Sequence, residues 1–396
     1  MSAAPRRRAL LAVALAGSLL GGCVTLPRDS FTAAEQATAS PVGFSHVRYA
    51  QDDPALAAML GRTLKPDDAG AVDVLAISGG GANGAFGAGL LYGWSRTGQR
   101  PQFELVTGVS AGALAAPFAF LGPDWNERLR QTYFGPPIHN LLQSRGIFSL
   151  LTPGLFRKAP LNQLVHAYVT DDLLQAIAVE HAKGRRLLVA TTDLDTGELV
   201  VWDMGAIASH PGPAARELFA QVLIASATVP GVFAPTMIEV EGGGRRFSEM
   251  HVDGQADSAF FAIPETLFLG VRPASPRYNH RLFILVNGQL GSLFAVTPRA
   301  TMPILRRTID VTTKASIRAA MITTLQFCQQ KACELSVASM PATQTDDALD
   351  FADAHIRSLF SAGQAIGESG KAWTLAAPTL LDAAKPQAPA GSPAAP

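Results

Sequence analysis

Ser110 stands between two glycines in the segment Gly108-Val109-Ser110-Ala111-Gly112. An apolar run ends at Gly108, and Ala, Leu and Phe recur at helical spacing after Gly112. The segment predicts a strand that turns sharply into a helix, with a nucleophilic serine hydroxyl protruding at the bend. The positive end of that helix would stabilise negative charge at the same place. Small residues at such a turn can also serve packing alone, and the spacing does not exclude that interpretation.

A second glycine-rich segment, GGGANG (Gly79 to Gly84), lies between a predicted buried strand and a predicted helix. Its backbone N–H groups could bind an anion. A dinucleotide-binding loop would need an acidic residue at the end of the next strand, where Gly108 and Ser110 stand instead. A Walker loop would need a lysine after Gly84. An oxyanion hole explains both segments, because the carboxyl ends of neighbouring parallel strands meet at one edge of a sheet.

Asp253 and Gly254 end another predicted strand and offer a base for the serine. Asp-Gly is also a common turn. A carboxylate with a pKa near 4 is a weak base, so we expect its site to be partly desolvated. His251 is the competing base, because on a strand it would share a face with Asp253. A Ser–Asp–His order would need His280 or His355, and neither stands in a convincing strand-end loop.

The sequence predicts neither a metal site nor a cofactor. Asp193 and Asp195 lack the other ligands of a calcium loop, and the turn at Asp195-Thr196-Gly197 explains them. Cys328 and Cys333 could pair only if a turn separates them, because a continuous helix would hold them too far apart. The sequence leaves that pairing open.

Strands and helices alternate along the chain, which predicts an α/β fold with a mainly parallel sheet. Leu141–Phe156 is apolar but interrupted by Gly146, Pro153 and Gly154, which suits either a buried loop or a lid that contacts a membrane. We expect strands over residues 72–78, 105–108, 186–192, 199–202, 246–252, 281–286 and 335–338. We expect helices over residues 86–94, 113–120, 161–182, 217–226, 304–326 and 352–366.

The N-terminal residues resemble a bacterial lipoprotein signal. Three arginines at 6–8 precede an apolar stretch, Ala9–Leu20, that is too short to span a bilayer. Leu20-Gly21-Gly22-Cys23 resembles a lipobox, whose cysteine is lipidated, and the residue after it, Val24, favours the outer membrane by resemblance to the sorting rule. An ordinary secretory signal with an incidental cysteine is the alternative.

We therefore expect a signal peptide over 1–22, a lipidated tether over 23–70, one domain over 71–375 and a disordered Ala/Pro-rich tail over 376–396. The 396 residues carry 32 basic and 32 acidic side chains, so nothing indicates a nucleic-acid partner. No repeat or linker divides the central part, which favours a single large domain.

Together, four motifs resemble the patatin-like phospholipase family and occur in its order. They are GGGANG (79–84), GVSAG (108–112), SATVPGVFAP (226–235) and VDG (252–254). The resemblance implies a three-layer α/β/α sandwich with a mainly parallel central sheet.

The resemblance also assigns roles to residues of this sequence. It implies a Ser–Asp dyad of Ser110 and Asp253, with an oxyanion hole at Gly79, Gly80 and Gly81. The residues that would support these motifs are Asn83, Gly84, Gly108, Gly112 and Gly254. The chain departs from the family at two positions: Asn83 stands where Arg is frequent, and Gln255 stands where Gly or Ala is usual and could narrow the substrate pocket.

The resemblance implies a lipid acyl hydrolase that releases fatty acid from phospholipid or another acyl ester at a membrane surface, without a cofactor. An acyltransferase would use the same residues. A lipoprotein without activity, binding lipid or a partner in the crevice, is the third hypothesis.

Overall fold

The computed structural model describes residues 28–67, 70–135, 141, 155–268, 279–291, 294–331 and 333–375. The expected signal peptide with Cys23, nearly all of the apolar stretch Leu141–Phe156, and the tail 376–396 lie outside these residues. Among the described helices, none is long and apolar enough to cross a membrane.

The described strands form a single mixed sheet. They are β1 (Ser40–Pro41), β2 (Arg48–Ala50), β3 (Ala71–Ile77), β4 (Leu105–Val109), β5 (Arg186–Asp193), β6 (Glu198–Asp203), β7 (Thr236–Gly242), β8 (Arg245–Asp253), β9 (Asn279–Val286), β10 (Glu334–Ser339) and β11 (Thr374–Leu375). Its order is β1-β7-β8-β5-β4-β3-β9-β10-β11; off this path, β6 pairs with β5 and β2 pairs with β6. The central strands β5, β4, β3, β9 and β10 are parallel. The prediction of a mainly parallel central sheet is confirmed.

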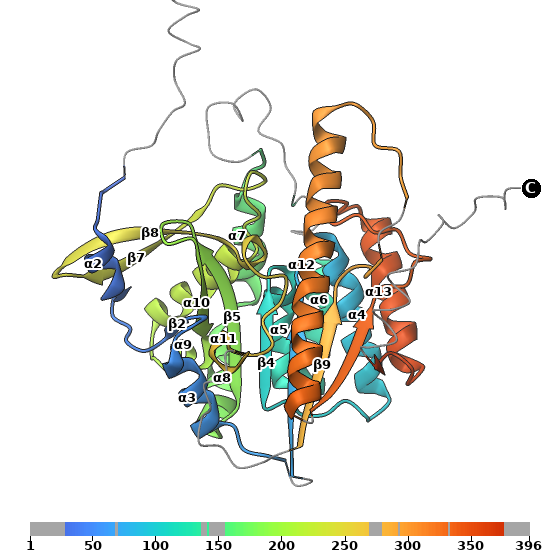
Figure 1. The fold of residues 1–396 in the computed structure, drawn as a ribbon, viewed down its shortest axis with the longest axis horizontal. Coiled ribbons are helices and arrows are strands. Elements are labelled where there is room, and N and C mark those ends of the chain that lie inside the picture. Colours follow the sequence, from blue (N-terminus) through green and yellow to red (C-terminus); the bar gives the residue numbers. More distant parts are fainter. Residues whose placement is uncertain are drawn as a thin grey trace, which may run out of the picture.

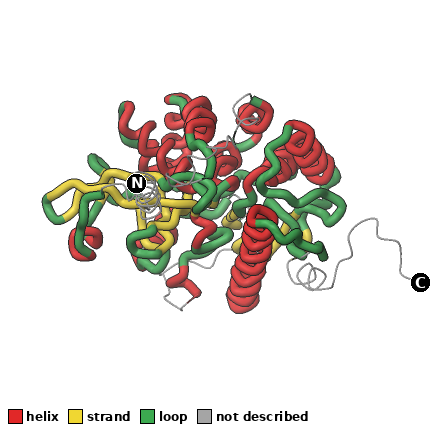
Figure 2. Tube along the Cα trace, turned by 90° about the horizontal axis from the view of Figure 1, so that it is seen from above, coloured by secondary structure: helices red, strands yellow, loops and turns green. Residues whose placement is uncertain are grey.

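Helices cover both faces of the sheet (Figures 1 and 2). They are α2 (Ala33–Ala37), α3 (Pro54–Thr63), α4 (Gly84–Arg96), α5 (Ala111–Leu121), α6 (Asn126–Phe134), α7 (Ala159–Tyr168), α8 (Asp171–Ala182), α9 (Met204–Ala208), α10 (Pro213–Ser226), α11 (Glu265–Phe268), α12 (Thr301–Lys331) and α13 (Asp353–Glu368). The apolar run 161–182 thus forms two helices, because Thr170 caps the start of α8. The layers agree with a patatin-like α/β/α fold.

Two hydrophobic clusters, one on each face, hold the layers together. In β3, Leu75 and Ile77 belong to the first cluster, whereas Val74 and Ala76 belong to the second. This alternation follows from the two-residue period of a strand, and a strand buried on both faces reads as a continuous apolar run. Helix α12 contributes Ile317, among others, to the second cluster.

The stretch expected to be a tether is part of the fold from Arg28 onward. Strand β1 pairs with β7 and β2 pairs with β6, so these residues extend the sheet at its edge. Val47 and Leu56 are buried, the latter in the second hydrophobic cluster. Because the segment as a whole is polar and rich in alanine, its composition does not predict these few buried side chains.

Cys328 and Cys333 form a disulfide, with their Cα atoms 4.6 Å apart. Helix α12 ends at Lys331, and the N–H of Cys333 donates to the C=O of Cys328 at 3.1 Å. The turn that pairing requires is therefore present between the two residues.

Candidate active site

Ser110 occupies the sharp turn between β4 and α5. Its backbone has φ +56° and ψ −125°, a region that side-chain-bearing residues rarely adopt. Cβ atoms at the two flanking glycines would collide with backbone: at Gly108 with Ala113, and at Gly112 with the C=O of Ser78. The glycines are therefore needed for this turn. The side chain lies below the surface, because Ser110 is only 2% exposed.

The sheet register brings Asp253 to this serine. Val109, the last residue of β4, pairs with Ala190 of β5, and Asp253, the last residue of β8, pairs with the next residue, Thr191. Because β6 occupies the other edge of β5 there, β4 and β8 meet end to end along one edge. The hydroxyl of Ser110 donates to Oδ2 of Asp253 at 2.6 Å. Residues 143 positions apart thus form a hydrogen-bonded pair.

Asp253 lies in a desolvated environment, as the sequence predicts for this carboxylate. It is 1% exposed. Burial raises the pKa of Asp253 to about 7, although hydrogen bonds from the Ser110 hydroxyl and the Gln255 N–H oppose that rise. Its other oxygen, Oδ1, accepts the Gln255 N–H at 2.9 Å. A Cβ on Gly254 would lie 2.7 Å from the C=O of Ala190, so this position also suits glycine.

Ser226, at the end of α10, supports the backbone of the nucleophile turn. Its hydroxyl accepts the N–H of Ser110 at 3.0 Å and donates to the C=O of Ala190 at 2.7 Å. Sequence reasoning placed Ser226 within a motif but gave it no role. Only the fold shows that this helix end reaches the turn after β4.

The glycine-rich loop follows β3 and lies beside the serine, because Ile77 pairs with Gly108 across the parallel strands. Gly80 (φ +154°) and Gly81 (φ +55°) adopt backbone conformations that favour glycine. Gly79 donates its N–H to the C=O of Ala259 at 3.3 Å. Within the described part of the chain, the N–H groups of Gly80 and Gly81 have no acceptor, so these two are the free donors of the loop.

Two asparagines hold this loop, and sequence reasoning gave Asn287 no role. Asn287 donates from its side chain to the C=O of Ser78 at 2.7 Å and from its backbone to the Ser78 hydroxyl at 2.9 Å. The side-chain amide of Asn83 donates to Asp346 at 2.6 Å, and Lys314 of α12 pairs with the same carboxylate at 2.9 Å. Gly84 begins α4 and packs against Ala111 at the start of α5.

His251 lies on the expected face but does not contact the serine. Its Nδ1 lies 3.0 Å from the Thr191 hydroxyl, and its Nε2 lies 3.2 Å from a carboxylate oxygen of Glu249. Burial opposes ionisation of Glu249, yet hydrogen bonds from Arg48 and His251 lower the pKa of Glu249 to about 2. The geometry therefore favours the Ser–Asp arrangement over one with histidine as the base.

Asp193, Glu249 and His251 have metal-ligand atoms within 4.8 Å of one another in the described residues. The carboxylate of Glu249 is already shared between Arg48 and His251. Asp193 accepts the N–H of Asp195 at 2.9 Å, as in an Asx turn. The turn expected after Asp193 is present, because the N–H of Gly197 also donates to the C=O of Asp193 at 2.8 Å.

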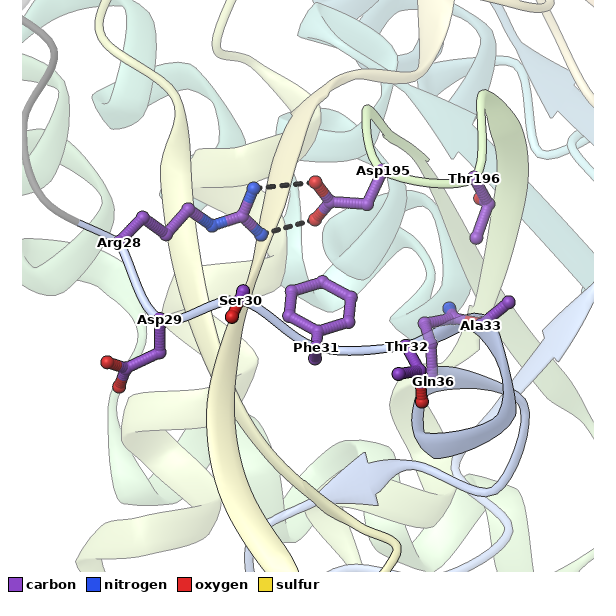
Figure 3. A pocket seen from close by; sticks show the side chains of 9 residues that line it. All are labelled: Arg28, Asp29, Ser30, Phe31, Thr32, Ala33, Gln36, Asp195 and Thr196. Carbon is purple, nitrogen blue, oxygen red and sulfur yellow. Dashed lines mark hydrogen bonds and ion pairs between the residues drawn. The ribbon is translucent and has the colours of Figure 1, made fainter.

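A pocket beside the N-terminal segment lies apart from the serine. It is lined by Arg28, Asp29, Ser30, Phe31, Thr32, Ala33, Gln36, Asp195 and Thr196 (Figure 3). Arg28 crosses it to pair with Asp195, with Nη1 2.6 Å from Oδ1. None of its lining residues belongs to the candidate dyad or to the glycine-rich loop. The ion pair instead fixes the N-terminal segment beside the turn after β5.

Fold and site together define an α/β/α protein with a buried serine–aspartate pair beside a glycine-rich loop. Residues 75–260 match the family model described as patatin-like phospholipase. Over these residues the chain is similar to patatin-like phospholipases. The match includes both Ser110 and Asp253.

The chain is also similar to several solved structures, with which it shares little sequence. They include VipD from Legionella pneumophila, at 12% identity and TM-score 0.34, covering 75% of this chain and 67% of that one. Human GIVD cytosolic phospholipase A2 has 12% identity and TM-score 0.34, covering 82% of this chain and 54% of that one. The type III effector protein ExoU has 12% identity and TM-score 0.29, covering 81% and 54%. Among curated proteins, none matches the chain in sequence.

Proposed function

We propose that this protein is a serine lipid acyl hydrolase that uses Ser110 as nucleophile and Asp253 as proton acceptor. The observation that carries the proposal is the 2.6 Å hydrogen bond from the Ser110 hydroxyl to Asp253, two side chains that are both buried. A base with a pKa of about 7 is matched to neutral pH, unlike an ordinary carboxylate.

In the proposed reaction, Oγ of Ser110 attacks the ester carbonyl carbon while its proton passes to Asp253. The carbonyl oxygen becomes an oxyanion and accepts the free N–H groups of Gly80 and Gly81. Asp253 then gives the proton to the departing alcohol, which leaves an acyl-serine. Water attacks that ester, again losing a proton to Asp253, and fatty acid is released as the proton returns to Ser110.

The test compares the wild type with Ser110→Ala and Asp253→Asn, using a fluorophosphonate probe and hydrolysis of a phospholipid and of a soluble ester. We expect labelling of the wild type, none of Ser110→Ala, and loss of hydrolysis in both variants. Ser209→Ala, which removes a hydroxyl bound to its own helix, is the matched control and should react normally. Near-native hydrolysis by either dyad variant would contradict the assignment of Ser110 and Asp253 as the catalytic dyad.

We also propose that the protein acts at a membrane surface with the carboxyl edge of the sheet facing the lipid. Helix α12 has 31 residues and spans about 46 Å, whereas β9 has 8 residues and spans about 26 Å. Since α12 runs from the carboxyl edge back to the start of β10, its first turns rise above the strands (Figure 1).

The raised end of α12 and the segment before it have the chemistry of a lipid-contacting surface. Phe294 is 72% exposed, Val296 82% and Ile304 52%. Residues 287–309 contain three arginines and no acidic residue, a composition that suits anionic head groups. Arg306 pairs with Asp347 and Arg307 pairs with Asp310, whereas Arg299 has no ion-pair partner among the described residues. Exposed aromatic and aliphatic side chains beside a positive charge favour a bilayer interface.

The proposed lipid anchor agrees with this orientation. Arg28 pairs with Asp195, which follows the carboxyl end of β5, so the described chain begins at the same edge as Ser110. Cys23 lies five residues earlier, and five extended residues reach at most about 17 Å. Lipidation there would hold the site near the membrane; Cys23→Ser should move the protein to the soluble fraction, and unchanged fractionation would contradict the anchor.

A further inference from the structure

Gln255 connects the candidate base to the glycine-rich loop. It lies in the short helical turn Gly254–Ala256 directly after Asp253, and its backbone N–H donates to Oδ1 of Asp253 at 2.9 Å. Its side chain extends to the other side of the site, where a Cβ on Gly79 would lie 2.9 Å from Cγ of Gln255 and would collide with the carboxamide. The carboxamide thus lies between the dyad and the loop that carries the free N–H donors.

The side-chain nitrogen of Gln255 is buried and has no hydrogen-bond partner among the described residues. Two acceptors of the site already have donors: Asp253 accepts from Ser110 and from the Gln255 backbone, and the C=O of Gly79 accepts the Ser78 hydroxyl at 2.7 Å. Buried donors are nearly always paired in folded proteins. An unpaired donor between nucleophile and oxyanion loop therefore indicates that its acceptor arrives with the substrate.

We infer that the carboxamide N–H of Gln255 binds the acyl carbonyl oxygen of the substrate together with the N–H groups of Gly80 and Gly81. This inference rests on the proposed hydrolase function. As Ser110 attacks, the carbonyl oxygen becomes negatively charged, so the hydrogen bond strengthens in the transition state and raises kcat more than it affects KM.

The inference also gives a physical meaning to the two departures from the family pattern. Asn83, where Arg is frequent, donates its amide to Asp346 and brings no positive charge to the loop. Gln255, where Gly or Ala is usual, brings a neutral donor to the same region. The second departure then offsets the first.

The rival interpretation is that Gln255 only fills space and narrows the pocket. Gln255→Met distinguishes the two, because methionine keeps the length and most of the volume but has no N–H donor. Gln255→Ala removes both donor and volume. Gln175→Met, on the exposed side of α8, is the matched control for the same chemical change far from the site.

The experiment measures kcat and KM on a soluble short-chain p-nitrophenyl ester. It also measures the affinity for a trifluoromethyl ketone, whose carbonyl carbon is attacked by the serine hydroxyl so that the carbonyl oxygen becomes an oxyanion. We expect Gln255→Met to lower kcat about 100-fold with KM within about twofold, and to weaken the ketone by a similar factor. Gln175→Met should match the wild type in both measurements.

Wild-type kcat and ketone affinity in Gln255→Met would overturn the inference, and so would a faster Gln255→Ala. A wild type with no Ser110-dependent hydrolysis or ketone binding would overturn the proposed function and this inference with it. An active wild type and an unaffected Gln255→Met would overturn the inference alone. Thermal unfolding of each variant separates a folding defect from a kinetic one.

Discussion

The hydroxyl of Ser226 accepts the backbone N–H of Ser110 at 3.0 Å and is itself held by the C=O of Ala190. This contact joins the end of α10 to the turn after β4. Because Ser110 has φ +56°, its backbone must be held by its surroundings. The hydroxyl of Ser226 therefore positions Ser110, the proposed nucleophile, without reaching its hydroxyl.

Ser226→Ala should lower kcat about tenfold with little change in KM, because the nucleophile is misplaced while substrate binding is kept. It also leaves the Ser110 N–H and the Ala190 C=O unpaired, which should reduce the free energy of unfolding by about 1–3 kcal/mol. Steady-state kinetics and urea unfolding measure the two effects. A variant that loses stability but keeps kcat would limit Ser226 to a structural role.

The rate should fall in acid through protonation of Asp253. With its pKa at about 7, the carboxylate is the unprotonated form above that pH and the neutral acid below it. Because only the carboxylate can accept the Ser110 proton, kcat/KM should fall about tenfold per pH unit below about pH 6 and level off above about pH 8. A soluble ester keeps changes in membrane binding out of this profile.

His251→Gln tests whether His251, and not Asp253, is the general base behind this acid limb. The replacement can still hydrogen bond to Thr191 and Glu249, which hold the ring in the wild type. We expect the acid limb of kcat/KM to keep its position in this variant. An activity loss as large as that of Asp253→Asn would instead favour His251 as the base.

The buried base should cost stability at neutral pH. The pKa of Asp253 is about 7 in the folded protein and near 3.9 when unfolded, so the folded state binds the proton more tightly. Its stabilising contribution is complete below about pH 4 and is lost as the pH rises through about 7.

Asp253→Asn removes this titration. At pH 8 it should raise the free energy of unfolding by about 1–4 kcal/mol, and at pH 4 the gain should vanish. The gain at pH 8 is smaller than the titration alone would give, because asparagine has one hydrogen-bond acceptor oxygen fewer than aspartate. Urea unfolding at the two pH values measures the difference. A variant less stable than the wild type at pH 8 would show that the carboxylate is not strained by its burial.

Local sequence patterns predict most of the fold and both members of the candidate dyad. The apolar strand before Ser110 and the flanking glycines predict the sharp turn, and the alternation of side chains before Asp253 predicts the strand that ends there. Local sequence does not predict that the ends of β4 and β8 meet, because this depends on how each strand pairs along β5. The contacts of Ser226 and Asn287 also join distant parts of the chain, so local sequence does not predict them either.

The sequence predicts a tether over residues 23–70, whereas the structure shows folded elements from Arg28 onward, and the reason for this difference is another one. Within residues 28–67, β1 pairs with β7 and β2 pairs with β6 through backbone hydrogen bonds that any sequence can make, and α3 packs through a few buried side chains. Only a few apolar side chains, such as Val47, are needed to hold these elements, so the composition of the segment resembles that of a linker. The segment folds because of its contacts with distant strands, which a local sequence pattern does not contain.

Replacing both Phe294 and Val296 by serine should weaken membrane binding. Burying these side chains in lipid contributes about 1.5–3 kcal/mol each, so the double variant should bind vesicles at least about 100-fold less tightly. Co-sedimentation with vesicles containing anionic phospholipid, in a Cys23→Ser background, isolates this surface from the proposed anchor.

The control for this double variant is Ile322→Ser, which removes an exposed apolar side chain from the lower part of α12, away from the raised end. It should bind vesicles like its parent, and all variants should hydrolyse a soluble ester at the parental rate. Equal loss of vesicle binding in Ile322→Ser would contradict a membrane-facing carboxyl edge, because that residue lies toward the opposite edge of the sheet.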